Sequence, residues 1–272
     1  MSQKIDTKTD QLLCEVEDQV ATIMLNRPEK RNALGDVITP ALRSTLSNLE
    51  TNDDVRVIII TGAGKAFCSG GDVSGMKGKK ETSERDRNDI INDLQEKQRT
   101  LSLRLYNLSK PTIAVIPGAA AGAGMSIALS CDMRICGTSG FFVTGFGNIG
   151  LSGDYGGSWQ LTKIVGPAKA KELYFTGRRI ESKEALSLGL INEVIEDDLL
   201  FEHSKEVARL VASKPPKAIS FMKLNINQAS EDNFETCLDW EAVRQIHCME
   251  TKDFSEGVSA FQEKRKPKFM GM

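Results

Sequence analysis

Apolar and polar residues alternate along the first part of the chain in patterns that predict strands and helices in turn. Two runs with a period of two residues, Leu12–Val16 and Val20–Leu25, flank a short polar stretch and predict a β-hairpin. Residues 35–50 place apolar side chains three or four positions apart, which predicts a helix. The β-branched run Val55–Thr61 predicts the next strand.

The middle of the chain continues this alternation. A helix is predicted over about 85–108, where one apolar stripe collects Ile90, Leu94, Leu101, Leu105 and Leu108. Thr112–Ile116 is predicted as a strand, and a turn of glycine and alanine residues then leads into a helix that ends near Asp132. Two short buried strands follow, Met133–Cys136 and Phe141–Val143.

Beyond Gly157 the pattern becomes mainly helical, with one short strand at Ile191–Val194. Helices are predicted over roughly 158–165, 168–175, 182–188, 199–213, 217–229, 231–249 and 253–264. Alternating strands and helices followed by helices alone predict an α/β protein, with a core domain at 1–199 and a helical segment at 200–272. Periodicity alone equally allows a doubly wound sheet.

Charge is almost absent from the middle third of the chain. Between Lys110 and Asp154 only Asp132 and Arg134 are charged. Residues 111–131 are long enough to cross a membrane, but they include two prolines and several glycines, and they lack interfacial aromatic residues. We therefore expect this run to form the interior of the domain, and we expect no membrane association.

Composition narrows the class of protein further. The 272 residues include 35 basic and 37 acidic ones, for a formal net charge of −2, and no segment is basic enough to indicate nucleic-acid binding. The N-terminus is polar, without the apolar core of a signal peptide. Six cysteines are scattered along the chain. We expect a cytoplasmic protein with free thiols.

Three chemical motifs are too weak to assign a function. Residues 145–150 match G-x-G-x-x-G, but more loop follows instead of the helix that a dinucleotide needs. Cys131 and Cys136 have no second pair of cysteines or histidines nearby, and His203 and His247 lie in polar helices, so no metal site is expected. The chain also lacks the G-x-S-x-G motif of α/β-hydrolases.

Two glycine-rich segments indicate chemistry done by the main chain. Residues 67–73 follow a strand, and residues 118–125 turn from a strand into a helix. Glycine leaves backbone N–H groups unobstructed, and two such groups converging on one point form an oxyanion hole. Tight packing of a helix against a sheet would explain the same glycines.

Asp154 is the first acidic residue after the neutral run and lies in a glycine-rich loop before a predicted helix. An aspartate at this place commonly caps the helix. Alternatively, the carboxylate enters an apolar pocket, where desolvation raises its pKa toward that of a general base.

Several segments, in order, resemble the crotonase (enoyl-CoA hydratase/isomerase) superfamily between about Leu12 and Phe269. They are residues 25–34, 67–76, 110–132, 150–166, 185–192 and 260–265. The resemblance implies a ββα-spiral acyl-CoA-binding core over 1–199 and an oligomerisation segment over 200–272, in a homotrimer or dimer of trimers. The substrate would be an acyl-CoA thioester, so CoA is part of the substrate and no separate cofactor is expected.

The same resemblance implies roles for individual residues. The amides of Gly71 and Ala123 would hold the thioester oxygen and stabilise an enolate. The CoA chain would pass near residues of the first loop and the oxyanion loop, namely Lys30, Arg31, Ala33, Gly70, Asp72 and Val73. Phe261 and Lys264 would approach the nucleotide end, often from a neighbouring subunit.

The chain departs from the hydratase pattern at two positions. Hydratases of the family use two glutamates, where this chain has Ser126 and Phe146. Asp154 instead matches the aspartate of some isomerase members, such as dienoyl-CoA isomerases and ring-1,2-epoxyphenylacetyl-CoA isomerase. Dehalogenases of the family also have an aspartate here, but the histidine base that they add is absent from the first oxyanion loop.

We therefore favour a CoA-thioester isomerase in which Asp154 alone moves the proton. A hydratase that holds water with Asp154 and Ser126, a non-catalytic acyl-CoA-binding protein and a thioester hydrolase remain alternatives. The acyl pocket would be lined partly by residues 77–93, with five candidate walls: Met76, Ile90, Phe146, Tyr155 and Trp159.

Overall fold

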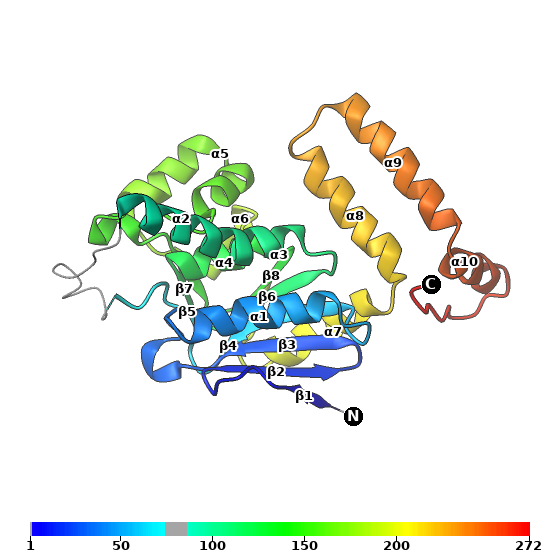
Figure 1. Cartoon of the computed structure of the whole chain (residues 1–272), viewed down its shortest axis with the longest axis horizontal. Coiled ribbons are helices and arrows are strands. Elements are labelled where there is room, and N and C mark those ends of the chain that lie inside the picture. The colour runs from blue at the N-terminus through cyan, green and yellow to red at the C-terminus, as the bar shows by residue number, and fades with distance from the viewer. Residues whose placement is uncertain (1, 74–85) are drawn as a thin grey trace.

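Two β-sheets organise the chain in the computed structural model, which describes residues 2–73 and 86–272 (Figure 1). Within these residues the larger sheet has the strand order β1-β2-β3-β4-β6-β8-β11 and the smaller one the order β10-β9-β7-β5. The strands are β1 (Gln3–Ile5), β2 (Leu12–Glu17), β3 (Val20–Leu25), β4 (Val57–Gly62), β5 (Ala66–Cys68), β6 (Thr112–Ile116), β7 (Ala119–Ala121), β8 (Met133–Gly137), β9 (Phe141–Val143), β10 (Ile180–Glu181) and β11 (Glu193–Ile195).

Helices cover the sheets and then extend beyond them. They are α1 (Ile38–Glu50), α2 (Arg87–Gln98), α3 (Arg104–Asn107), α4 (Ala123–Ser130), α5 (Gly157–Thr176), α6 (Ser182–Ser187), α7 (Leu200–Ala212), α8 (Pro216–Ala229), α9 (Phe234–Met249) and α10 (Lys252–Gln262). Three single turns complete the described elements: the 3₁₀ turns η1 (Pro28–Lys30) and η4 (Phe146–Ile149), and the π-helical turn η3 (Arg99–Leu103).

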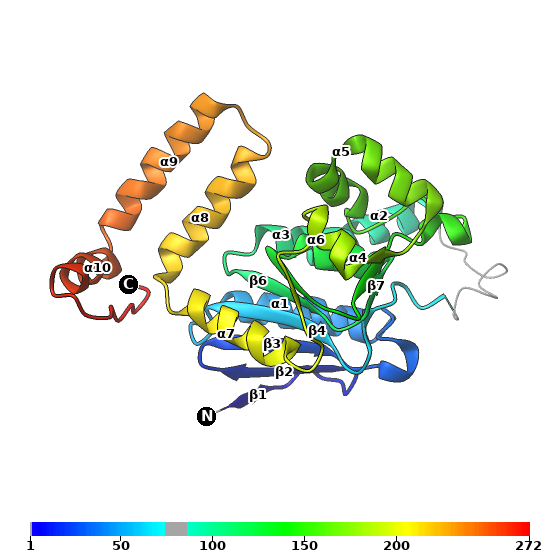
Figure 2. The ribbon, with the colours of Figure 1, turned by 180° about the vertical axis from the view of Figure 1, so that it is seen from behind.

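The larger sheet is buried on both faces at its centre. β2 and β3 form the predicted antiparallel hairpin, whereas β3, β4, β6, β8 and β11 run parallel. Along β4, Ile58 and Ile60 pack in the cluster that contains α1, and Val57 and Ile59 pack in the cluster that contains α7. This alternation follows from the two-residue period of a strand. Figures 1 and 2 show α1 and α7 on opposite faces of this sheet.

Most of the neutral middle third forms the interior, as predicted, but residues 147–153 near its end are exposed. Every residue of β6 is buried, and so is every residue of α4. No helix in the described part of the chain is both long and apolar enough to cross a bilayer. All six cysteines are unpaired, and burial raises the pKa of the Cys68 and Cys131 thiols to about 12.

The long helix predicted over residues 85–108 is interrupted by the π-helical turn η3. Leu101, Leu105 and Leu108 are buried, but Ile90 and Leu94 are 46% and 41% exposed. A π-helical turn closes over five residues instead of four, so it rotates the following residues relative to the preceding ones. The prediction of one continuous apolar stripe was therefore wrong at Ile90 and Leu94.

The C-terminal helices divide into a packed part and a projecting part. α7 packs against the larger sheet through Leu200, Ala208 and Ala212. α8, α9 and α10 extend away from the sheets (Figure 1). Polar contacts join α8 to the core: Lys223 Nζ lies 2.9 Å from Asp132 Oδ2, and Asn227 donates a hydrogen bond of 3.0 Å to the Tyr106 carbonyl. The division of the chain into domains at residues 199 and 200 stays a prediction.

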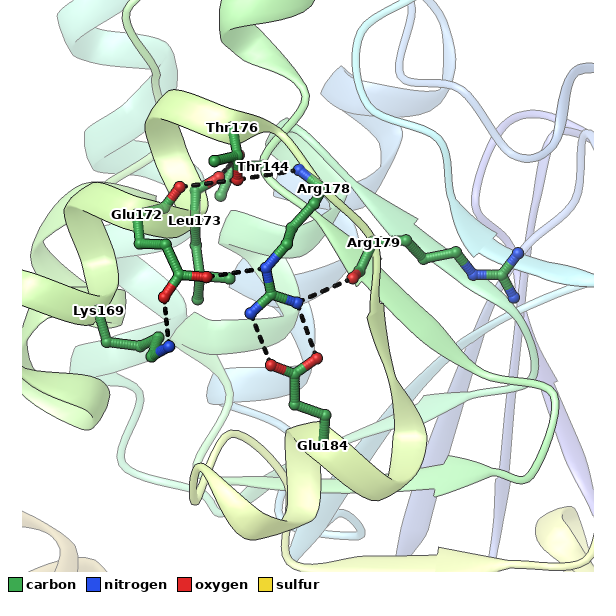
Figure 3. Close-up of polar contacts among 8 residues, drawn as sticks. All are labelled: Thr144, Lys169, Glu172, Leu173, Thr176, Arg178, Arg179 and Glu184. Carbon is green, nitrogen blue, oxygen red and sulfur yellow. Dashed lines mark hydrogen bonds and ion pairs between the residues drawn. The ribbon is translucent and has the colours of Figure 1, made fainter.

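A cluster of charged residues fixes the C-terminal end of α5 (Figure 3). Arg178 donates hydrogen bonds of 2.8 and 2.6 Å to the two oxygens of Glu184 and one of 2.9 Å to Glu172. Hydrogen bonds from Arg178 hold the pKa of Glu184 below its ordinary value. Gly166, with φ +76° and ψ 162°, interrupts α5 between this cluster and the Asp154 loop, so the cluster fixes the part of the helix after the break, where the sequence predicted a separate helix.

Candidate active site

The two glycine-rich segments meet because the strands before them are parallel neighbours. β5 pairs with β7 in the smaller sheet, and each strand has three residues. The carboxyl ends of parallel neighbours lie at the same sheet edge, so the turn containing Gly70 and Gly71 lies beside the turn containing Gly122 and Ala123.

Contacts of the main chain show how close the two turns are. Gly70 has φ +93°, and a Cβ atom added to it would lie 2.9 Å from the Ala121 carbonyl oxygen and 3.5 Å from the Ala123 nitrogen. A Cβ atom added to Gly124 would lie 2.3 Å from the Cys68 carbonyl oxygen. The glycines therefore serve close backbone packing, the alternative open at the sequence level, and the same packing places two backbone turns side by side.

Two backbone N–H groups at this junction are available to a ligand. Leu34 donates to the Gly70 carbonyl and accepts from the Asp72 N–H, both at 2.7 Å, and this pattern turns the Gly71 N–H away from Leu34. Ala123 is the first residue of α4, where an N–H group has no partner within the helix. Neither N–H donates to a protein acceptor among residues 2–73 and 86–272.

Asp154 lies in a loop whose backbone turns sharply before α5. Gly153, Tyr155 and Gly156 have φ values of +122°, +51° and +76°. The N-cap of α5 is Gly156, and no side chain caps this helix, so Asp154 is not a capping residue. Within the described residues, Asp154 Oδ1 is buried and has no hydrogen-bond partner. This desolvation raises the pKa of Asp154 from 3.8 to about 6.

One cavity brings the three predicted chemical groups together. It has a volume of about 520 Å³ and is lined by Leu34, Gly35, Asp36, Thr39, Pro40, Arg43, Gly71, Asp72, Leu94, Lys97, Ala123, Asp154 and Tyr155. A Cβ atom added to Gly71 would meet no atom within 4 Å, so space is open beside its backbone. The cavity thus places two backbone donors and one carboxylate around a common space.

The other two carboxylates of the cavity differ from Asp154. Asp36 is exposed to solvent. Asp72 forms an ion pair of 3.1 Å with Arg27, whose guanidinium also donates to the Ala33 carbonyl at 2.8 Å. Among the carboxylates that line the cavity, Asp154 is the one with a buried oxygen that has no hydrogen-bond partner in the described residues.

Ser126 and Phe146 lie beneath the cavity and do not line it. Ser126 is buried and donates to the Gly122 carbonyl at 3.3 Å, and a Cβ atom added to Gly157 would lie 2.3 Å from its hydroxyl oxygen. Phe146 is buried and stacks on Tyr174, with 6.2 Å between the ring centroids. Both side chains contact the protein core around the Asp154 loop, and their predicted contact with substrate stays a prediction.

The predicted CoA-binding residues fall into two groups. Lys30 and Arg31 are exposed on the loop after β3, and Ala33 is buried beside them. Val73 is exposed next to Asp72. Phe261, on α10, is 86% exposed, and Lys264 follows this helix. In both views α10 lies at the far end of the projecting helices (Figures 1 and 2). Within one chain, Phe261 and Lys264 are therefore not brought to the cavity.

The candidate walls of the acyl pocket are only partly brought to the cavity. Tyr155 lines it, whereas Ile90 and Trp159 do not. Trp159 packs edge-on against Tyr106, with 5.4 Å between the ring centroids, and lines a separate cavity of about 300 Å³ that Tyr155 also borders. Met76 and most of the segment 77–93 lie outside the described residues.

Several residues of the site were not predicted from the sequence, among them Arg43, Leu94, Lys97 and Gln98. Arg43, Leu94 and Lys97 line the cavity, and Gln98 accepts a hydrogen bond of 2.9 Å from the Tyr155 N–H. The positive charge of Lys97 is paired with Asp93 at 2.7 Å. Leu94, Gln98 and Leu101 follow one another at spacings of four and three residues, as in an ordinary α-helix. The sequence therefore showed no sign of the π-helical turn η3, or of which side of α2 faces the cavity.

Residues of other chemical classes do not gather at this site. In the described parts of the chain, no three histidine, cysteine, aspartate or glutamate side chains are arranged to hold a metal ion. The G-x-G-x-x-G segment forms η4 between Gly145 and Gly150, and α5 begins only at Gly157. The prediction that loop follows this motif is confirmed.

Known proteins match the chain over nearly its whole length. A family model described as enoyl-CoA hydratase/isomerase matches residues 15–272. The 1,2-epoxyphenylacetyl-CoA isomerase of Escherichia coli strain K12 is 35% identical over 268 residues, 96% of this chain and 98% of that protein. The short-chain-enoyl-CoA hydratase of Clostridium acetobutylicum is 34% identical over 256 residues, 94% of this chain and 95% of that protein.

Solved structures match equally well. The crystal structure of an enoyl-CoA hydratase from Bacillus anthracis has a TM-score of 0.90 at 31% identity, covering 97% of this chain and 100% of its own. A putative enoyl-CoA hydratase from Streptomyces coelicolor A3(2) has a TM-score of 0.90 at 32% identity, covering 96% of this chain and 94% of its own. The two-sheet arrangement and the projecting helices are therefore shared with these structures.

Proposed function

Because the chain belongs to the enoyl-CoA hydratase/isomerase (crotonase) family, we propose that it moves the double bond of an unsaturated acyl-CoA thioester, with Asp154 carrying the proton. The family membership makes the chain an enzyme of acyl-CoA thioesters. The raised pKa and the unpartnered oxygen of Asp154 support the choice of isomerisation. So does the likeness to the Escherichia coli isomerase.

The oxyanion hole is proposed at the N–H groups of Gly71 and Ala123. The thioester oxygen would accept from both, and the negative charge that it gains as an enolate would be stabilised by them. Ala123 begins α4, so the positive end of the helix dipole adds to this stabilisation. Loss of one such donor typically raises a barrier by about 3 kcal/mol.

Asp154 would act twice in one turnover. Its carboxylate takes a proton from one carbon of the acyl chain, and the electron pair of that C–H bond moves toward the thioester oxygen. The protonated Asp154 then returns the proton to a different carbon as the enolate collapses. Atoms and charge balance without a co-reactant, so one group that alternates between base and acid is sufficient.

The observation that carries this proposal is the state of the carboxylates around the cavity. Within residues 2–73 and 86–272, the buried Oδ1 of Asp154 has no hydrogen-bond partner, whereas Asp72 is paired with Arg27 and Asp36 is exposed. Ser126 and Phe146, which replace the two glutamates of hydratases, cannot ionise at neutral pH. A proton shuttle needs one titrating group, and hydration normally needs two.

Hydration of a 2-enoyl-CoA is the second candidate, and the similarity to the Clostridium acetobutylicum hydratase favours it. It would require Asp154 to activate a water molecule with help from a second group. Ser126 is poorly placed to help, because its hydroxyl donates to the Gly122 carbonyl and packs against Gly157.

The path of CoA is proposed from the placement of the exposed loops. Lys30 and Arg31 offer positive charge to the phosphates, and the backbone from Gly70 to Val73 leads from them into the cavity. Phe261 and Lys264 would reach the nucleotide from α10 of another copy, because their own α10 lies far from the cavity (Figure 1).

The first test replaces the proposed base. Asp154→Asn keeps the size of the side chain and removes its basicity, so we expect turnover of a 3-enoyl-CoA to 2-enoyl-CoA to fall at least about a thousandfold. Asp36→Asn, which removes the exposed carboxylate of the same cavity, should change turnover only a few-fold. The absorbance of the conjugated thioester reports both rates.

Three results would contradict the proposal. Near-normal turnover by Asp154→Asn would remove Asp154 from the proton transfer. Rapid conversion of crotonyl-CoA to 3-hydroxybutyryl-CoA by the unmodified enzyme, without isomerisation of 3-enoyl thioesters, would favour the hydratase. Binding of acyl-CoA with no turnover of either class would favour a non-catalytic role.

A further inference from the structure

A hydrogen bond from a distant segment of the chain holds the loop that carries Asp154. The backbone N–H of Tyr155 donates a hydrogen bond of 2.9 Å to Gln98 Oε1, across 57 residues of sequence. Tyr155 is only 8% exposed, so water cannot easily replace this acceptor. This hydrogen bond therefore fixes the orientation of the peptide unit that joins Asp154 to Tyr155.

This loop needs an external constraint. Gly153, Tyr155 and Gly156 all have positive φ, and for Tyr155, at +51°, this conformation is intrinsically unfavourable. The Asp154 side chain does not fix itself, because its Oδ1 has no partner among the described residues. The direction of the carboxylate therefore depends on the backbone on either side of it.

Gln98 is placed for this task by the irregular helix beneath the loop. It is the last residue of α2, and the π-helical turn η3 begins directly after it. Its own carbonyl accepts from the Ser102 hydroxyl at 3.2 Å. Before this widened turn, α2 is exposed and lines the cavity through Leu94 and Lys97. After the turn, Leu101 and Leu105 are buried.

We propose that Gln98 is a positioning residue for Asp154: its side-chain oxygen holds the Tyr155 N–H and so fixes the strained loop that aims the carboxylate into the cavity. The inference rests on the proposed role of Asp154 as the proton carrier. Gln98 itself does not line the cavity and touches no reacting atom. Its effect is on the chemical step and leaves substrate binding unchanged.

The experiment compares three variants of the full chain. Gln98→Leu removes the acceptor, Gln98→Glu keeps an acceptor oxygen at the same place, and Gln95→Leu makes the matched change at an exposed glutamine of the same helix. We expect Gln98→Leu to lower kcat roughly 10- to 100-fold, because misplacing a reacting group by about 1 Å costs this much. KM should change less than about threefold, Gln98→Glu should recover most of kcat, and Gln95→Leu should match the unmodified enzyme.

Separate results identify failure of each idea. If Asp154→Asn abolishes turnover but Gln98→Leu keeps normal kcat, the positioning role is wrong and the proposed function stands. If Asp154→Asn remains active, the proposed function itself is wrong. A loss of kcat in Gln98→Leu that Gln98→Glu does not restore, or that comes with an equal loss in Gln95→Leu, would show a general weakening of the helix and overturn the inference. Thermal unfolding of each variant confirms that the compared proteins are folded.

Discussion

Asp154 is still ionised at neutral pH, although burial raises its pKa to about 6. Its carboxylate is therefore available as a base, and it is a stronger base than an exposed aspartate would be. A polar atom left buried without a partner usually destabilises a protein by about 1–3 kcal/mol. Such a cost is common at sites that perform chemistry, where a ligand supplies the missing contact.

The raised pKa predicts how activity depends on pH. Only the deprotonated Asp154 can accept a proton, so lowering the pH through the pKa removes active enzyme. We expect kcat/KM to fall about tenfold per pH unit below about pH 6, measured with a 3-enoyl-CoA under conditions where the enzyme stays folded. An aspartate with the ordinary pKa of 3.8 would keep full activity to about pH 5, and that result would contradict the desolvated site.

At the level of single residues, the sequence pointed to Asp154 but could not show how buried its carboxylate is or whether it has a hydrogen-bond partner. The neutral run before it indicated a buried environment, but residues 147–153 are exposed, and burial at this loop is limited to the Asp154 Oδ1 atom and Tyr155. Whether an oxygen atom finds a partner depends on side chains from distant segments. The Gln98–Tyr155 contact joins residues 57 positions apart and follows from no local pattern.

At the level of elements, the parallel pair β5 and β7 determines where the two backbone donors lie. The two strands are parallel neighbours, so the turns after them begin at the same edge of the sheet. Gly70 is essential to this arrangement for two reasons. Its φ of +93° suits glycine, and the Ala121 carbonyl leaves no room for a side chain.

This packing predicts different effects for two glycine substitutions. Gly70→Ala should lower kcat at least about tenfold and reduce the free energy of unfolding by more than about 2 kcal/mol. The positive φ strains the backbone of alanine, and the added Cβ atom collides with the Ala121 carbonyl oxygen, so the two costs add. Gly150→Ala has a similar φ of +74° but meets no atom within 4 Å, so only the backbone cost of about 1–2 kcal/mol should appear. Kinetics and denaturant unfolding distinguish the two. Equal effects at both positions would mean that the close contact at Gly70 is unimportant.

The elements that the sequence predicted well are those with strong apolar patterns. The hairpin β2–β3, the strands β4 and β6 and the C-terminal helices all lie close to their predicted positions, and the predicted crotonase fold is confirmed by the solved structures. β5 and β7 were missed because each has three residues, and β7 consists only of alanine. Such strands are specified by their neighbours more than by their own composition.

At the level of the whole molecule, the projecting helices expose many large apolar side chains, and such surfaces are typical of contacts between proteins. The largest exposed apolar side chains on α8, α9 and α10 include Met222, Ile226, Phe234, Leu238, Trp240, Val243, Ile246 and Phe261. The helices α8 and α9 contact each other, but α9 has no buried residue at all. This surface supports the prediction that several copies of the chain associate.

We expect the protein to form a homotrimer or a dimer of trimers in solution. Light scattering after gel filtration should then give three or six times the mass of the 29.8 kDa chain. Ile226→Glu places a charge on the projecting surface and should shift the population toward smaller species. Leu199→Glu, at an exposed residue before α7, serves as the control. A monomer at micromolar concentration would contradict the prediction.

The contact between the Gly70 and Ala123 turns has a consequence for how such a fold changes over evolutionary time. Backbone atoms alone set the spacing of the two donors, so exchanging the surrounding side chains leaves it intact. A new reaction can therefore arise when substitutions place an acidic or basic side chain at a different position around the same pair of backbone N–H donors.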